Sequence, residues 1–249
     1  MTMLTGKVAL VTGSGAGIGR AIAESYAREG ARLVISDVNA ALGAGTVAAI
    51  EAAGGQAVFV KADVAEAAGH VALVAAAHQH FGALHIACNN AGIAGGGRAL
   101  TETTDEDWGR VIAVNLTGVF LGMRAQIPAI AAAGGGAIVN IASVLGSVAI
   151  PNSAPYVASK HGCVGLTRAA ALEAAGQKVR VNAVGPGFIA TPMAASLDQA
   201  SIDAIAAKHA LGRWGTAQEI AEVALWLASD KASFVTGAYY TADGGYSAQ

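Results

Sequence analysis

Apolar and polar positions follow two different patterns along the chain. Short apolar runs rich in β-branched residues predict strands at residues 8–12, 32–37, 57–64, 137–143, 178–187 and 238–242, and a strand that runs into a loop at 84–92. Longer alanine-rich stretches predict helices at 20–30, 40–53, 66–80, 104–132, from 155 onward and twice within 199–229. This alternation is typical of repeated βαβ units, so we expect an α/β fold built on a doubly wound parallel sheet.

No linker, low-complexity segment or charge block interrupts the alternation. The Gly-Gly-Gly runs at 95–97 and 134–136 fit turns better than linkers. We therefore expect a single domain over residues 1–249.

Composition excludes several classes of protein. The formal net charge is −2 and no basic block is present, which argues against a nucleic-acid partner. No uninterrupted apolar run reaches membrane-spanning length, and the first residues do not form a secretory signal, so we expect a soluble, cytoplasmic protein with no membrane partner. Cys88 and Cys163 provide neither a disulfide framework nor a metal quartet, and without an HExxH or CxxC motif we expect no metal site.

The segment from Ser143 to Lys160 holds a hydroxyl, a phenol and an ammonium. Tyr156 and Lys160 are four residues apart in a predicted helix, so their side chains share one face. A nearby ammonium favours the ionised form of a phenol, which makes it a better base. Ser143 follows a predicted strand, at the sheet edge where parallel α/β proteins bind ligands. Taken alone, the Tyr-Lys pair also fits a solvated helix surface.

A glycine-rich turn, TGSGAGIG at 12–19, joins the first strand to the first helix. Glycines let a phosphate approach the backbone N–H groups at the start of a helix. We expect the pyrophosphate of a dinucleotide here, at Gly13, Gly15, Gly17, Ile18 and Gly19. The spacing G-x-x-x-G-x-G departs from the more usual G-x-G-x-x-G.

Asp37 ends the second predicted strand and is followed by Val38. A carboxylate at this position can accept hydrogen bonds from the adenosine ribose hydroxyls and repels a 2′-phosphate. The only nearby base, Arg20, could equally point to solvent, so we expect NAD (NADH) rather than NADP, with Asp37 and Val38 in the site. The simpler alternative for Asp37 is a turn residue.

Six motifs occur in order: TGSGAGIG, NNAG at 89–92, VNLTGVF around Asn115, Ser143, YVASK at 156–160 and NAVGPGFIATPM at 182–193. Together they resemble the short-chain dehydrogenase/reductase family, in its single-domain NAD(P)-dependent form, over residues 5–245. The resemblance implies a Rossmann-like, doubly wound, seven-stranded parallel sheet with helices on both faces. It also implies a homotetramer packed through the long helices that begin near Thr104 and Pro155. One departure is Ala142, where many members have a second serine before the catalytic one.

The resemblance implies a role for each matched residue. Tyr156 becomes the acid/base, Ser143 orients the substrate oxygen, Lys160 binds the nicotinamide ribose, and Asn115 holds a water that links Lys160 to solvent. The further cofactor contacts are Asp63 and Val64 at the adenine, Asn90, Ala91 and Gly92 at the adenosine ribose, and Pro186, Gly187, Ile189 and Thr191 at the nicotinamide amide. Without the resemblance, Asn89, Asn90 and Asn182 fit strand ends and loop ties equally well.

Substrate contacts are expected from a loop at about 187–213, from residues 93–98 and from the segment after Ser143. The candidates are mainly apolar: Val144, Leu145, Ile150, Asn152, Phe188 and Met193. They predict a neutral, fairly hydrophobic secondary alcohol or ketone as the small-molecule partner. Val144 and Leu145 fit core positions equally well.

We therefore expect an NAD-dependent oxidoreductase that acts on CH–OH groups by hydride transfer. One alternative is a 3-oxoacyl-(acyl-carrier-protein) reductase, which needs a basic docking surface; the flanking segments offer only Arg124, Arg168 and Lys178. The other is a non-catalytic dinucleotide sensor, whose signature would be a missing member of the Ser143, Tyr156, Lys160 and Asn115 set.

Overall fold

The sheet confirms the predicted architecture. The structure is a computed structural model that describes residues 2–192 and 198–248. All paired strands are parallel, in the order β3-β2-β1-β4-β5-β6-β7. The strands are β1 (Val8–Thr12), β2 (Arg32–Asp37), β3 (Gln56–Lys61), β4 (Ile86–Asn89), β5 (Gly136–Ile141), β6 (Val179–Pro186) and β7 (Tyr239–Ala242). The order reverses between β1 and β4, and such a switch point is where open α/β sheets bind ligands.

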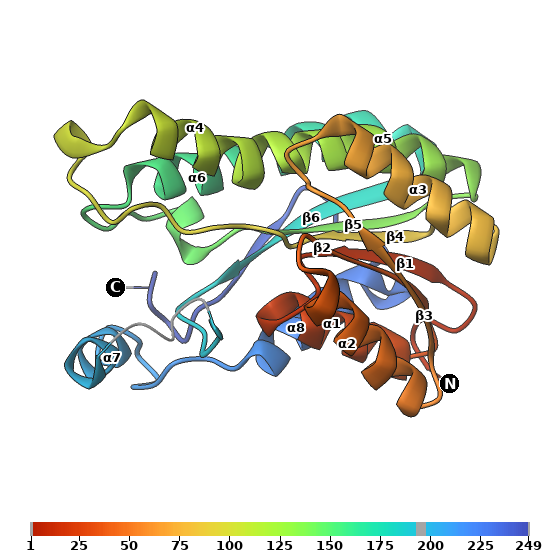
Figure 1. Cartoon of the computed structure of the whole chain (residues 1–249), viewed down its shortest axis with the longest axis horizontal. Coiled ribbons are helices and arrows are strands. Elements are labelled where there is room, and N and C mark those ends of the chain that lie inside the picture. The colour runs from red at the N-terminus through yellow and green to blue at the C-terminus, as the bar shows by residue number, and fades with distance from the viewer. Residues whose placement is uncertain (1, 193–197, 249) are drawn as a thin grey trace.

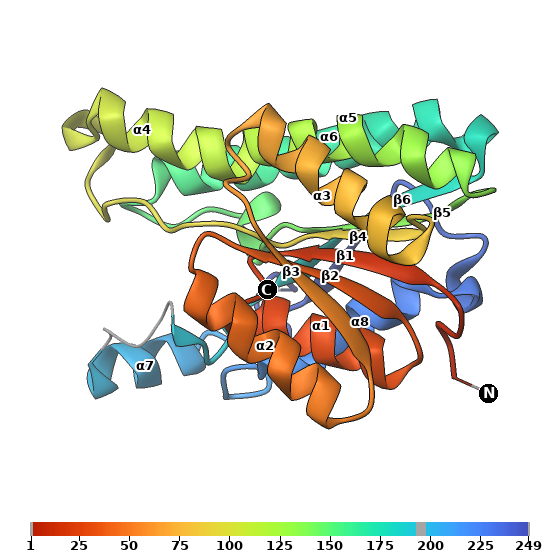
Figure 2. The same ribbon diagram turned by 45° about the vertical axis from the view of Figure 1, so that its right-hand side comes forward.

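Helices cover both faces of this sheet (Figure 1). One face carries α1 (Gly17–Arg28), α2 (Ala40–Ala52) and α8 (Ala217–Ala228). The other face carries α3 (Ala67–Phe81), α4 (Asp105–Ile112), α5 (Gly118–Ala132) and α6 (Ala154–Ala174). The short helix α7 (Gln199–Ala206) lies apart from both layers, as Figure 2 shows.

The core has two halves, one on each face of the sheet. Along β1, Ala9 and Val11 pack with the residues of α1 and α8, whereas Val8 and Leu10 pack with those of α3 and α5. Successive side chains of a strand point to opposite faces, so a strand covered on both sides is apolar at most positions. This explains why the strands read as mainly apolar runs in the sequence, in which Asn140 and Asn182 are buried polar exceptions.

One predicted strand ends earlier in the structure. The strand predicted to reach residue 64 ends at Lys61, because the Asp63 carboxylate accepts a hydrogen bond from the Ala65 N–H and turns the chain. The strand expected to run into a loop within 84–92 does so after Asn89, where the Asn90 and Ala91 N–H groups donate to the Thr12 hydroxyl instead of to a backbone carbonyl. Helix α1 begins at Gly17 rather than at residue 20, so the glycine turn forms its first turn.

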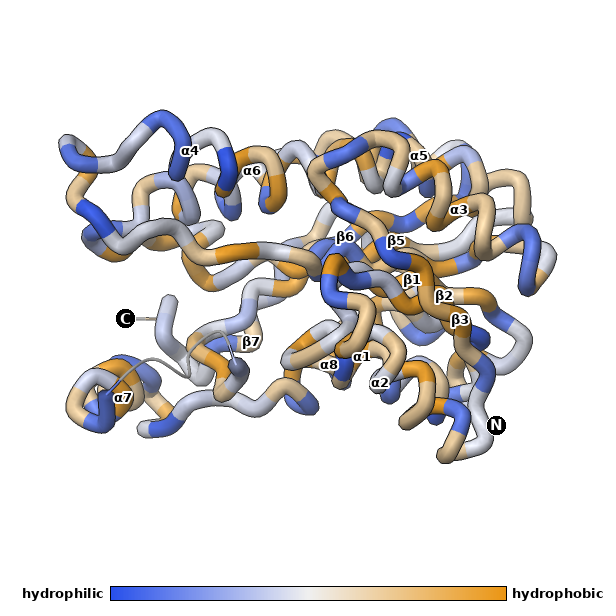
Figure 3. The backbone as a smooth tube through the Cα atoms, viewed as in Figure 1, coloured by the Kyte–Doolittle hydropathy of each residue, from blue (hydrophilic) through white to orange (hydrophobic). Residues whose placement is uncertain are grey.

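The long helix predicted over 104–132 is continuous over Asp105–Ala132, but it contains a π turn at Ala113–Thr117. Thr104 caps it by accepting a hydrogen bond from the Asp107 N–H. By length and composition alone this helix could cross a membrane. In the fold its α4 and α5 parts pack on α6 and α3 (Figure 1), and its first turn is hydrophilic (Figure 3).

Candidate active site

A cavity of about 790 Å³ opens at the carboxyl edge of the sheet. Most of the predicted site residues line it: Gly13, Gly17, Ile18, Gly19, Asp37, Val38, Asp63, Val64, Asn90, Ala91, Gly92, Ser143, Val144, Leu145, Ile150, Asn152, Tyr156, Lys160, Pro186, Gly187, Phe188, Ile189 and Thr191. Gly15 and Asn115 are not among the lining residues. Met193 lies outside the described residues. The cavity therefore brings together residues that are far apart in the sequence.

The glycine turn brings the start of α1 to the cavity wall. Gly13 and Gly17 have φ angles of 61° and 54°, in the left-handed region that favours glycine. A Cβ at Gly19 would lie 2.2 Å from the Gly13 carbonyl oxygen, so only glycine permits this packing. The first-turn N–H groups of a helix have no partner within the helix, which makes this end of α1 a suitable place for a phosphate.

Asp37 stands at the end of β2 and faces the glycine turn. One carboxylate oxygen accepts a hydrogen bond from the Gly15 N–H at 2.9 Å, and the other accepts one from the Asn39 N–H at 2.9 Å. Gly15 thus supports Asp37 without lining the cavity. The nearby Arg20 forms an ion pair with Glu24 on the same helix at 2.7 Å. Among the described lining residues the cationic side chains are Arg110 and Lys160.

Ser143 follows β5 and begins a single turn of 3-10 helix, Val144–Gly146. Its Oγ accepts a hydrogen bond from the Leu145 N–H at 3.2 Å. This bond orients the oxygen and leaves the hydroxyl hydrogen as a donor. Because Ser143 lines the cavity, that hydrogen can be donated to the oxygen atom of a bound molecule.

Tyr156 and Lys160 project from the first turns of α6. The Lys160 side chain is buried, and its Nζ donates a hydrogen bond to the carbonyl of Ile141, the last residue of β5, at 2.9 Å. The same Nζ lies 5.5 Å from the centre of the Tyr156 ring. The ammonium is therefore fixed between the end of β5 and the phenol.

Asn115 lies in the π turn and is fully buried. Its amide exchanges two hydrogen bonds with the Ile93 backbone, at 2.8 and 2.9 Å, and donates a third to the Ser159 hydroxyl at 3.3 Å. It thereby ties the loop after β4 to α6. A water held by Asn115 for Lys160 stays a prediction.

Part of the cavity wall is apolar. Val144 and Leu145 are only 1% and 5% exposed, yet both line the cavity, so they belong to the core and to the wall at once. Phe188 packs edge-on against the His209 ring at 5.9 Å, and its backbone N–H donates to His209 Nε2 at 3.2 Å. Trp214 also packs against Phe188, at 5.8 Å.

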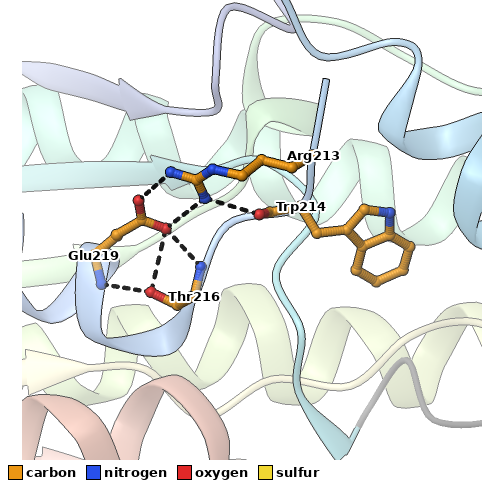
Figure 4. Close-up of polar contacts among 4 residues, drawn as sticks. All are labelled: Arg213, Trp214, Thr216 and Glu219. Atoms are coloured by element: carbon orange, nitrogen blue, oxygen red, sulfur yellow. Dashed lines mark hydrogen bonds and ion pairs between the residues drawn. The ribbon is translucent and has the colours of Figure 1, made fainter. Parts of the chain in front are cut away.

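A cluster at the start of α8 anchors the end of the predicted substrate loop (Figure 4). The Arg213 guanidinium donates to both oxygens of Glu219, at 2.6 and 3.0 Å, and to the Trp214 carbonyl at 3.0 Å. Thr216 and Glu219 complete a capping box. The Arg213 bonds and the Thr216 N–H lower the pKa of Glu219 to about 2. The Trp214 indole points away from this cluster.

Arg110, Val114 and Trp214 also line the cavity, although the sequence interpretation assigned them no role. Arg110 forms an ion pair with Asp107 at 2.7 Å, and the second Asp107 oxygen accepts a hydrogen bond from the Gly96 N–H, which places α4 next to the loop at 93–98. Arg110 and Trp214 belong to none of the motifs, whereas Val114 is the first residue of VNLTGVF, in which only Asn115 received a role. Arg110 and Val114 are four residues apart, so a periodicity analysis of the long helix could at best have placed them on one face.

Similarity to known proteins agrees with this geometry. A family model described as enoyl-(acyl carrier protein) reductase matches residues 13–247. The cyclohexanol dehydrogenase of Acinetobacter sp. is 48% identical over 98% of this chain and 96% of its own length. The 2,5-dichloro-2,5-cyclohexadiene-1,4-diol dehydrogenase LinX of Sphingobium indicum is 41% identical over 98% and 97%. The crystal structure of a levodione reductase superimposes with a TM-score of 0.95 at 37% identity, covering 98% of this chain and 99% of that one. The chain belongs to the short-chain dehydrogenase/reductase family.

Proposed function

We propose that the protein is an NAD-dependent oxidoreductase that interconverts a neutral, fairly hydrophobic cyclic secondary alcohol and its ketone, with Tyr156 as acid/base. The proposal rests on one observation: the candidate catalytic residues and the candidate cofactor-binding residues line the same continuous cavity. Ser143, Tyr156 and Lys160 line one part of it, and the glycine turn and Asp37 line another. We further propose that the 1–249 chain acts as one domain, which holds the cofactor and carries out the chemistry.

Family members use nicotinamide dinucleotides, and the residues here fit one. The glycines at the start of α1 provide a cradle that a single Cβ at position 13 or 19 would fill, since it would lie within 2.8 Å of backbone atoms. The Asp37 carboxylate, next to this cradle, suits two ribose hydroxyls and disfavours a 2′-phosphate. Arg20, the nearby base, is paired with Glu24. These contacts support NAD over NADP.

Oxidation of an alcohol to a ketone removes a hydride from carbon and a proton from oxygen. When bound, the nicotinamide supplies the hydride acceptor, and in the reverse direction the donor. Tyr156 takes the hydroxyl proton as a phenolate and returns it as a phenol in reduction. Ser143 donates its hydroxyl hydrogen to the substrate oxygen, and the buried Lys160 ammonium lies 5.5 Å from the centre of the Tyr156 ring.

The apolar wall supports the substrate class. Val144, Leu145, Ile150, Phe188 and Trp214 offer no charge to a ligand, whereas a polar or ionic substrate needs buried partners. The relatives named above act, by their names, on cyclohexanol and on a chlorinated cyclohexadienediol, both cyclic alcohols. A ring of this size with one hydroxyl group suits a cavity that also takes a dinucleotide.

The test uses the whole protein with cyclohexanol and NAD, and with cyclohexanone and NADH or NADPH. Tyr156→Phe should lower kcat by about 10²- to 10⁴-fold while the Kd for NADH stays unchanged. Tyr240→Phe, a substitution on the exposed part of β7, is the matched control. Near-normal turnover by the Tyr156 variant would refute the mechanism. Turnover confined to NADPH and acetoacetyl thioesters would instead favour the alternative of a 3-oxoacyl-(acyl-carrier-protein) reductase.

Cofactor choice is tested by Asp37→Asn, which keeps an oxygen for the Gly15 N–H but removes the charge. We expect the preference for NADH over NADPH to narrow by about tenfold. An unchanged preference would mean that Asp37 does not select the cofactor.

We also propose a homotetramer in the cytoplasm. Large apolar side chains remain exposed on the helices that the family uses for assembly: Trp108 and Phe120 are each 44% exposed, and Leu172 is 84% exposed. Burying them against another copy would remove apolar surface from water. Light scattering after gel filtration should give about four times the 24.5 kDa mass of one chain.

A further inference from the structure

Tyr239, on the strand β7, contacts the backbone of Ser143, in the turn that follows the strand β5. Tyr239 is the first residue of the edge strand β7, and its hydroxyl donates to the Ser143 carbonyl at 2.5 Å. The same carbonyl accepts a second hydrogen bond from the Gly146 N–H at 2.8 Å. A carbonyl oxygen has two lone pairs, so both are used.

The fold makes room for this contact at Gly185 in β6. Tyr239 pairs with Ala183, and its ring crosses the neighbouring strand above Gly185. A Cβ at position 185 would lie 2.5 Å from the Tyr239 hydroxyl oxygen and 2.6 Å from the carbon that bears it. The phenol can therefore reach from β7 over β6 to the end of β5 only because β6 has a glycine there. Burial raises the pKa of Tyr239, which keeps the hydroxyl protonated as a donor at neutral pH.

The contact restrains the geometry of the Ser143 hydroxyl. Ser143 is extended, with φ −178° and ψ 159°, and its Oγ accepts from the Leu145 N–H. The Tyr239 bond fixes the carbonyl and with it the peptide plane that follows Ser143. That plane carries the Val144 N–H and leads directly into the turn, whose Gly146 N–H bonds to the same carbonyl. The Leu145 N–H, one peptide further on in this turn, is the donor that orients Oγ.

We propose that Tyr239 is a positioning residue, which holds the Ser143 hydroxyl in the direction of the substrate oxygen through the Ser143 carbonyl. The proposal rests on the proposed function, because it assigns the catalytic hydrogen bond to Ser143. If Tyr239 were needed only for packing, Tyr239→Phe would leave kcat/KM unchanged, because the ring would remain. A positioning role instead requires the hydroxyl, so this substitution distinguishes packing from positioning.

The first test is a double-mutant cycle on the full-length protein with cyclohexanol and NAD. Tyr239→Phe should lower kcat/KM by about 3- to 10-fold, the value of one hydrogen bond, with the Kd for NADH unchanged. In a Ser143→Ala background the same substitution should have no further effect, because no hydroxyl is left to orient. Tyr240→Phe should leave kcat/KM unchanged, since Tyr240 packs on Trp226 at 5.3 Å and is 37% exposed.

The second test does not depend on the substrate. The N–H groups of Leu145, Gly146 and Ser147 are bonded within the turn after Ser143, so Tyr239→Phe should speed their hydrogen exchange, and Tyr240→Phe should not. Unchanged exchange, or an equal loss of kcat/KM with and without the Ser143 hydroxyl, would overturn the positioning role alone. Full activity of Ser143→Ala would overturn both this role and the catalytic role proposed for Ser143.

Discussion

Replacing Gly19 by alanine adds one methyl group at the tightest point of the glycine turn, the proposed cofactor cradle. The new Cβ would lie 2.2 Å from the Gly13 carbonyl oxygen and 2.4 Å from the Asn90 side-chain nitrogen. An ordinary contact needs about 3.4 Å, so α1 or the turn must move by about 1.2 Å. Neither neighbour yields easily, because the Asn90 amide donates both to the Thr12 carbonyl at 2.9 Å and to the Gly13 carbonyl at 3.1 Å.

The magnitude follows from two opposing effects. Overpacking a rigid site costs about 1–3 kcal/mol, whereas alanine is favoured over glycine in a helix by about 0.5–1 kcal/mol. We expect a net destabilisation of about 1–2 kcal/mol, which corresponds to a Tm lower by about 2–8 °C in a domain of this size. The displaced turn should also lose at least one charge-assisted hydrogen bond to the pyrophosphate, which weakens NADH binding by about 10- to 100-fold.

The assay is thermal unfolding of the protein without cofactor, followed by fluorescence titration with NADH. Gly45→Ala is the matched control: Gly45 is exposed within α2, and a Cβ there meets nothing within 4 Å. Because only helix propensity acts at that position, the control should be slightly more stable and bind NADH normally. If Gly19→Ala matched the control in both measurements, the close approach of α1 to the glycine turn would not be needed for the cradle.

Two further predictions concern stability. The pKa of Glu219 is about 2 in the folded protein and near 4.5 without its Arg213 and Thr216 partners, so its contribution is fully present above about pH 4.5 and is lost as the pH falls toward 2. Glu219→Gln should therefore lower the Tm at pH 7. In a thermal-unfolding series the Tm difference between the variant and the unsubstituted protein should shrink below pH 4.5. A Tm difference that stays constant with pH would contradict the lowered pKa of Glu219. Asn140→Ala should lower the free energy of unfolding by about 2–4 kcal/mol, as measured by urea titration. The reason is that the buried Asn89 amide and the Thr167 hydroxyl both lose their hydrogen bond to the Asn140 side chain. A change below about 1 kcal/mol would indicate that these groups find other partners.

Much of the fold could be predicted because the relevant signals are local. A strand buried on both faces is apolar at most positions, so β1 and β5 stand out in the sequence without any knowledge of their neighbours, although β5 also contains the buried Asn140. The start of the long helix is a local signal too: Thr104 and Asp105 both fit a cap in the sequence, and the structure has the cap at Thr104. The end of β3 was predicted too late, because Asp63 turns the chain through a side-chain bond to the backbone.

The parts of the site that escaped prediction depend on contacts between distant segments. The residues around Asn115 do not indicate a π turn in the sequence, because they fit an ordinary α-helix equally well. Trp214 lines the cavity only because the Arg213–Glu219 pair and the bond from its indole to the Ile202 carbonyl hold it there. Tyr239 lies 96 residues from Ser143 in sequence, and its contact requires the glycine in β6 between them.

The two parts of the cavity are therefore built in different ways, and this has a consequence for substrate choice. The groups proposed as catalytic are tied to the sheet, since Lys160 bonds to the end of β5 and Tyr239 bonds to the Ser143 carbonyl. Val144 and Leu145, the part of the apolar wall next to Ser143, belong to the core, so changes there would also disturb the Ser143 hydroxyl. The rest of the wall comes from segments held by a few side-chain contacts, such as Phe188 on His209. We therefore expect substitutions around Phe188 to change substrate choice without moving Ser143, Tyr156 or Lys160.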